Sequence, residues 1–303
     1  MLATFFSRSN PTQYILIIFL VIIYIVLKFN TSNFIINELI FTASLFITIS
    51  YAITKFIISK NSLSKKNSYG LICLFVSICL MLEINFSYKI AISAFFLLLA
   101  LRRMLSLRSP ININKKVFDT SFWLLISSFF YPSTLIFFTL LIITLVLYAH
   151  LNLKNILIII FSTISALSIN YLASFLYSYN IDLNIFIESY LLDFNKINFT
   201  YYFDTKTNLL TLSFLLFLLL FFLSYIWSSF IKTNERRRST SLIILISICS
   251  FLIIDPLKQT SYIFLLFPYV VLISKFFENS KQSIFDSLII TALLITPFLS
   301  LFL

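Results

Sequence analysis

The chain has 303 residues, of which 60% are hydrophobic and only 11% are charged, and its mean hydropathy is +1.02. A soluble domain carries roughly 25% charged residues, so this composition excludes an ordinary soluble fold. The net charge of +11 does not indicate nucleic acid, because the basic residues stand in short blocks between apolar runs, as membrane topology requires. We therefore expect a lipid bilayer with anionic head groups as the partner, and no nucleic acid.

Eleven apolar segments have lengths near that of a membrane-spanning helix. In chain order they lie at 13–29, 34–58, 70–86, 88–102, 117–131, 132–150, 155–178, 207–230, 241–256, 259–277 and 285–303. None has the alternating polarity of barrel strands, and helices satisfy their own backbone groups in lipid. The sequence therefore predicts an all-α fold, a polytopic transmembrane helix bundle of about eleven spans. It forms a single integral membrane domain, 1–303, with possible sub-bundles 1–178 and 207–303.

Two places along the chain need separate interpretation. Segments 117–131 and 132–150 meet at "FFYPST", and Pro132 there predicts a break between two helices. The alternative, one continuous helix, would invert all later topology. The 179–208 loop spaces Leu183, Phe186, Ile187 and Tyr190 on one helical face, which predicts an interfacial helix on the outer side of the membrane.

The basic residues predict the orientation. With the N-terminus in the cytoplasm, 17 of the 22 Lys and Arg residues fall on the cytoplasmic side, as the positive-inside rule requires. The stretch "LRRMLSLRSPININKK", residues 101–116, contributes five of them. We expect two basic blocks to anchor the protein to anionic lipid head groups: Arg102, Arg103, Arg108, Lys115, Lys116, Arg236, Arg237 and Arg238. A specific cytoplasmic site for phosphate or for a partner, built from residues 101–116, is the alternative.

The scarcity of some residue types excludes several chemistries. Gly70 is the only glycine, which excludes P-loop and dinucleotide-binding motifs. His150 is the only histidine, which excludes metal sites rich in histidine. We expect no metal-ligand residues, and the sequence gives no evidence of a cofactor. It allows a divalent metal, but no pattern of residues supports one.

Carboxylates recur at the predicted outer ends of the spans. Glu38, Glu83 and Asp255 each stand at a different outer turn, and Lys89 and Lys258 accompany two of them. Ionisable groups at membrane level are costly and often functional. We predict that these five residues line an outward-facing cleft, although each carboxylate taken singly could be a helix cap or part of an ion pair.

The predicted architecture resembles that of integral-membrane glycosyltransferases that use polyprenyl-phosphate sugars. The resemblance implies Glu38 or Glu83 as the base toward an acceptor hydroxyl, and Lys89 or Lys258 as the partner of the lipid phosphate. The sequence departs from that pattern, because its first outer loop is very short and lacks the Asp-containing motif of those enzymes.

A second resemblance covers nearly the whole chain. It rests on "MLATFFSRSNP", on "LRRMLSLRSP" followed by "KKVFDTSFW", and on "DPLKQTSYIFLLFPYVVLISKFFE". These blocks resemble, in the same order, an uncharacterised family of bacterial multi-pass inner-membrane proteins from the gliding-bacteria branch. The resemblance implies a place in the bacterial inner membrane and no established activity.

Three functions fit these observations. The first is handling or glycosyl transfer of a polyprenyl-lipid-linked substrate at the outer face, in cell-envelope biogenesis. The second is a non-catalytic membrane scaffold of an envelope or secretion assembly. A transporter is the third and fits least, because only Pro268 and Pro297 lie well within predicted spans, where transporters usually break their helices. Whether the protein is an enzyme stays open.

Overall fold

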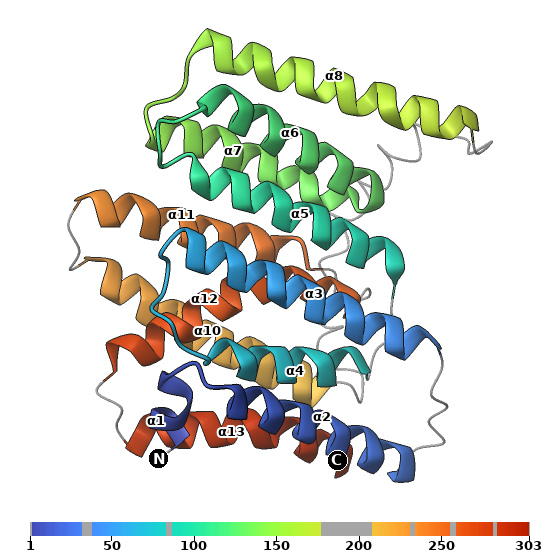
Figure 1. The fold of residues 1–303 in the computed structure, drawn as a ribbon, viewed down its shortest axis with the longest axis vertical. Coiled ribbons are helices and arrows are strands. Elements are labelled where there is room, and N and C mark those ends of the chain that lie inside the picture. The colour runs from blue at the N-terminus through green and yellow to red at the C-terminus, as the bar shows by residue number, and fades with distance from the viewer. Residues whose placement is uncertain are drawn as a thin grey trace. The chain divides into compact units, whose positions relative to one another are not determined.

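A computed structural model of the chain describes residues 2–31, 38–82, 87–176, 208–230, 234–254, 259–280 and 284–302. Every regular element in these ranges is a helix (Figure 1), as an apolar chain in lipid requires. The helices group into two compact units.

Unit 1 contains seven α-helices within the described residues. They are α1 (Leu2–Ser7), α2 (Pro11–Thr31), α3 (Glu38–Lys60), α4 (Gly70–Leu82), α10 (Asn208–Phe230), α12 (Leu266–Asn279) and α13 (Ile284–Phe302). Helix α4 is the centre of the unit, since it contacts α2, α3, α10, α12 and α13. Its residues 71–80 are all buried, which explains why a helix of 13 residues is apolar on every side.

Unit 2 contains α5 (Tyr88–Ser106), α6 (Ile113–Phe130), the 3-10 helix η1 (Pro132–Leu135), α7 (Ile136–Leu147), α8 (Leu153–Leu176) and α11 (Asn234–Leu252). The 3-10 helix η3 (Gln259–Leu265) crosses from this unit to unit 1 along the chain. Helix α6 contacts α5, α7 and α8 (Figure 1), so it is the core of unit 2. The prediction of a single membrane domain with two possible sub-bundles stays a prediction.

Six segments of the described residues are long and apolar enough to cross a membrane, so the count of about eleven is not supported by length and composition. They are Pro11–Lys28, Thr42–Lys60, Leu153–Leu172, Leu210–Phe230, Thr260–Asn279 and Ile284–Leu301. Three further apolar helices are shorter: Gly70–Leu80, Pro132–Leu147 and Arg238–Leu252. The remaining two predicted segments are helical as α5 and α6, but each helix carries three charged residues in fewer than 20 positions.

The predicted break at "FFYPST" is confirmed. Tyr131 has extended backbone angles, φ −146° and ψ 101°, and Pro132 begins η1 rather than continuing α6. Proline lacks the N–H that a continuing helix would need, so the chain turns here. The interfacial helix predicted within 179–208 falls almost entirely outside the described residues.

Close packing around Gly70 holds the centre of unit 1 together. A Cβ atom at this position would lie 2.8 Å from Val270 Cγ1 and 3.3 Å from the Tyr51 ring. The one glycine of the chain therefore stands where side chains of α3 and α12 leave no room for a Cβ atom on α4. Nearby, Phe214 of α10 stacks on Tyr269 of α12 with ring centroids 4.5 Å apart.

Serine hydroxyls join the helices of unit 2. Ser93 Oγ of α5 donates to Ser127 O at 2.9 Å, and Ser127 Oγ of α6 donates to Ser93 O at 2.8 Å. Ser121 of α6 and Ser162 of α8 also hydrogen-bond through their hydroxyls. Small polar side chains allow helices to approach closely, and hydrogen bonds between helices contribute to their association in lipid.

Candidate functional site

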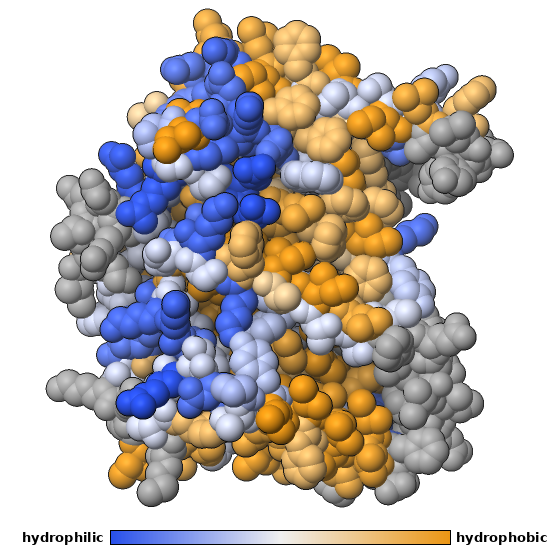
Figure 2. Space-filling view, in the orientation of Figure 1, coloured by the Kyte–Doolittle hydropathy of each residue, from blue (hydrophilic) through white to orange (hydrophobic). Residues whose placement is uncertain are grey.

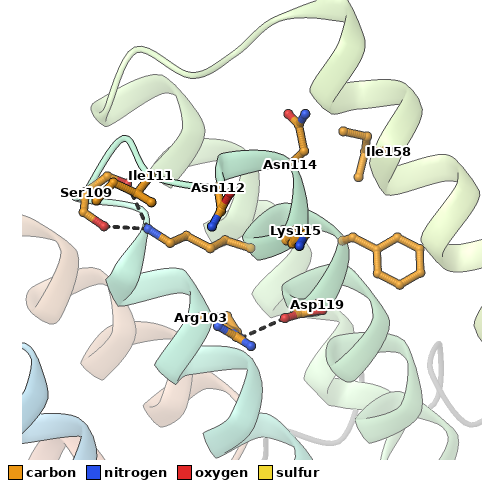
Figure 3. A pocket seen from close by; sticks show the side chains of 10 residues that line it. Arg103, Ser109, Ile111, Asn112, Asn114, Lys115, Asp119 and Ile158 are labelled. Carbon is orange, nitrogen blue, oxygen red and sulfur yellow. Dashed lines mark hydrogen bonds and ion pairs between the residues drawn. The ribbon is translucent and has the colours of Figure 1, made fainter.

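A pocket of about 610 Å³ lies in unit 2, where α5 joins α6 (Figure 3). Its walls come from the end of α5, the α5–α6 connection (residues 107–112), the first turns of α6, and α8. Figure 3 shows Ser109 and Ile111 of the connection on one side and Ile158 of α8 on the other. The lining residues are Arg103, Ser109, Ile111, Asn112, Asn114, Lys115, Lys116, Phe118, Asp119 and Ile158.

The local sequence explains the start of α6. Pro110 cannot donate a helical hydrogen bond, and Asn112 adopts the left-handed conformation at φ 54° and ψ 42°, which asparagine tolerates better than most residues. Asn112 is the N-cap, but its side chain makes no capping hydrogen bond. The first amide groups of α6 therefore lack a side-chain acceptor, and the positive end of the helix dipole lies at the pocket.

Lys116 of α6 holds the α5–α6 connection in place through hydrogen bonds. Its Nζ donates to Ser106 O at 2.7 Å, to Ser109 O at 2.9 Å and to Ser109 Oγ at 2.6 Å. The residue is buried, and burial, followed by the nearby charge of Arg103, lowers the pKa of its ammonium group. All three ammonium protons have a partner, so Lys116 supplies positive charge to the pocket but no free donor.

Arg103 and Asp119 form an ion pair across the α5–α6 hairpin. Arg103 Nε lies 2.9 Å from Asp119 Oδ2, and the two side chains are 43% and 30% exposed. An ion pair this exposed contributes only about 0.5 kcal/mol to stability. Its larger effect is to orient the guanidinium, whose terminal Nη atoms have no partner in the described part of the chain.

Lys115 is the other available cation. It is exposed, and its ammonium makes no hydrogen bond or ion pair with any residue that the structure describes. Counting Arg103, Lys115, Lys116 and Asp119, the lining carries a formal charge of +2. The pocket can therefore attract an anion and still offer it unpaired donors.

Apolar side chains border the same pocket. Phe118 of α6 and Ile158 of α8 line it, and Ile158 belongs to the candidate span Leu153–Leu172. Figure 2 shows hydrophilic surface gathered over the end of unit 2 where α5 joins α6, with apolar surface along the helices. One wall of the pocket therefore belongs to a helix that is long and apolar enough to cross a membrane.

The structure brings part of the predicted basic block together. Arg103, Lys115 and Lys116 line the pocket, whereas Arg102 and Arg108 do not. Arg102 is half-buried and Arg108 is exposed. In the second block Arg238 is exposed, and the side chains of two others lie outside the described part: Arg236 and Arg237.

The predicted outer cleft stays a prediction. Glu83, Asp255 and Lys258 lie outside the described residues, and Glu38 is the first residue of α3, with a side chain that is also outside them. Lys89 is described and exposed, in the first turn of α5. It is 14 residues from Arg103, or about 21 Å along the helix axis, so it stands at the opposite end from the pocket.

Sequence reasoning did not identify the neutral and acidic members of the pocket. Asn112, Asn114, Asp119 and Ile158 were not predicted as site residues, although they line it. One signal was present: Asp119 follows Lys116 by three positions, which places both on one side of a helix. The contribution of Ile158 had no local signal, because it depends on α8 packing against α6.

No group of three potential metal ligands occurs among the residues that the structure describes. The expectation that the protein uses no cofactor or metal stays a prediction.

Comparison with known proteins identifies a family. Residues 1–302 match a family of unknown function, DUF6427. The chain belongs to this family. Membership of DUF6427 over the whole length confirms the resemblance to a family without an established activity. No curated protein and no solved structure matches the chain.

Proposed function

We propose that this DUF6427 protein is a multi-pass protein of the bacterial inner membrane that binds a phosphate-bearing lipid at its cytoplasmic face. The binding site is the pocket of unit 2. One observation carries the proposal: two available cations, Arg103 and Lys115, share a pocket with Ile158 from a candidate membrane helix. Such a pocket suits a ligand that is anionic at one end and apolar at the other, as a lipid-linked substrate or an anionic lipid is.

We further propose that all eleven predicted segments cross the membrane, with the N-terminus in the cytoplasm. Contacts between helix ends support this topology, since predicted cytoplasmic ends meet one another. In unit 1, Ser68 Oγ lies 2.8 Å from Arg8 O, and Asn67 Nδ2 donates to Glu278 Oε1 at 2.7 Å.

Predicted outer ends also meet one another. Lys28 Nζ donates to Leu82 O at 2.6 Å, which joins the ends of α2 and α4 in unit 1. Tyr131 Oη donates to Ile253 O at 3.0 Å, which joins the ends of α6 and α11 in unit 2. These two contacts join helix ends that the eleven-segment topology places on the same side of the membrane. Reporters fused after His150 and after Phe186 should lie on the cytoplasmic and outer sides, respectively, and the reverse result would contradict the topology.

Lipid binding can be tested on the purified protein in detergent. Phosphatidic acid should bind, and the double variant Arg103→Gln with Lys115→Gln should weaken binding about 30-fold, from about 1 kcal/mol per basic residue. Arg108→Gln is the matched control, because Arg108 belongs to the same basic stretch but does not line the pocket. If the double variant binds as tightly as the wild type, or if the Arg108 variant is equally impaired, the pocket is not the site.

Glycosyl transfer at the outer face is a second proposal, with Glu38, Glu83 or Asp255 as base and Lys89 or Lys258 as phosphate partner. The exposure of Lys89 at the end of α5 opposite the pocket favours it, because a cation is available there. Deletion of the gene should then cause lipid-linked sugar intermediates to accumulate, and complementation with Glu38→Gln, Glu83→Gln or Asp255→Asn should fail. Normal surface glycans in the deletion strain would exclude this activity. A non-catalytic scaffold instead predicts a stable partner that co-purifies.

A further inference from the structure

The hydrogen-bond donors of the basic pocket differ in what remains available to a ligand. The Lys116 ammonium group donates all three of its hydrogen bonds to Ser106 and Ser109. Asp119 contacts Arg103 only through its Nε atom. The terminal nitrogens of Arg103 and the ammonium of Lys115 therefore remain, and they come from two different helices. A ligand placed between them would be contacted from two directions.

Two side-chain amides add further donors. Asn112 and Asn114 line the pocket and form no hydrogen bond through their side chains in the described ranges. The uncapped first turn of α6 begins at the same point, and helix N-termini favour anions. Four side chains and the N-terminal end of α6 therefore line one pocket. Together they offer a ligand more hydrogen-bond donors than a single exposed cation would.

The formal charge of the lining is +2, from three cations and Asp119. A phosphodiester head group carries one negative charge and offers two free oxygens, because its other two oxygens are esterified. A terminal phosphomonoester carries close to two negative charges at neutral pH and offers three oxygens. The monoester therefore matches the formal charge of the pocket, and it presents more acceptor oxygens to the four donor groups than a diester does.

The remaining walls determine where the rest of the ligand goes. Phe118 and Ile158 border the cationic part, and α8 exposes Leu157 and Phe161 beyond them. An apolar chain attached to the phosphate could follow this surface into the bilayer. The volume of about 610 Å³ lies within the range of small-molecule sites, so it admits a terminal phosphate with its first carbon atoms.

We propose that the pocket selects lipids that end in a phosphomonoester over lipids whose phosphate is a diester. Phosphatidic acid and a polyprenyl monophosphate belong to the selected class, and phosphatidylglycerol does not. The inference rests on the proposed lipid-binding function and narrows its substrate class.

The test compares three ligands with the full-length protein in detergent. Phosphatidic acid and phosphatidylglycerol with identical acyl chains differ only in the head group, and glycerol 3-phosphate supplies the monoester without a chain. We expect phosphatidic acid to bind about fivefold to tenfold more tightly than phosphatidylglycerol, from one additional charge beside the cations. The Arg103→Gln, Lys115→Gln double variant should lose most of this preference, whereas Arg108→Gln should keep it.

The outcomes separate the two proposals. Equal binding of the two lipids, with both weakened in the double variant, would overturn monoester selectivity and leave the lipid-binding function standing. No effect of the double variant on either lipid would overturn both proposals. If glycerol 3-phosphate competes as strongly as phosphatidic acid, the monoester preference would stand. The acyl chains would then contribute nothing to binding, and the ligand would be a free phosphate ester rather than a lipid.

Discussion

Lys116→Met should destabilise unit 2, and the size of the effect follows from the hydrogen bonds of the ammonium group. Lys116 Nζ holds Ser106 O, Ser109 O and Ser109 Oγ within 2.6–2.9 Å. A hydrogen bond to a charged group contributes about 1.5–3 kcal/mol. The burial that lowers the pKa of Lys116 offsets part of this, and water can reach exposed Ser109, so we expect a net loss of about 2 kcal/mol.

The assay is thermal unfolding of the purified protein in detergent, where this loss corresponds to a fall in Tm of roughly 4 °C. Lys115→Met is the matched control, since Lys115 is adjacent in sequence but exposed and without a partner in the described ranges. Its Tm should change by less than about 1 °C. An unchanged Tm for Lys116→Met, or an equal fall for both variants, would refute the structural role of Lys116.

The same group predicts a pH dependence. Because the pKa of Lys116 is lower in the folded protein than in the unfolded chain, the unfolded chain binds more protons between the lowered value and 10.5. The free energy of unfolding contributed by this group therefore rises with pH across that window. Lys116→Met should remove the rise, which unfolding curves at successive pH values can measure.

Three further substitutions test the fold. Gly70→Ala should destabilise unit 1 by about 2 kcal/mol, because the added Cβ would lie 2.8 Å from Val270 Cγ1, and an unchanged Tm would contradict this packing. Ser127→Ala should cost about 1 kcal/mol by removing the hydrogen bond from Ser127 Oγ to Ser93 O, whereas a more stable variant would show that this bond contributes nothing. Joint neutralisation of three arginines should reduce the amount of protein in the membrane, and a variant inserted at the wild-type amount would overturn their anchoring role: Arg102, Arg103 and Arg108.

The helical class could be predicted from the sequence because its cause is local. An apolar run longer than about 17 residues has to satisfy its own backbone groups in lipid, whatever surrounds it. Pro132 likewise breaks the helix through its own missing N–H. The number of spans could not be settled in this way, since α5 and α6 each combine apolar residues with three charged ones, and their packing against each other is decided by the tertiary structure.

The pocket shows what required tertiary structure. Lys115 and Lys116 are the same residue type at adjacent positions, and the sequence predicts the same anchoring role for both. On a helix, adjacent side chains point about 100° apart. The packing of α5 against α6 therefore directs Lys116 toward the carbonyl oxygens of Ser106 and Ser109 and leaves Lys115 free beside Arg103. The sequence by itself determined that this end of the protein is basic. Only the fold decided which charges are occupied and which can bind a ligand, because that depends on contacts between segments that are separate in the chain.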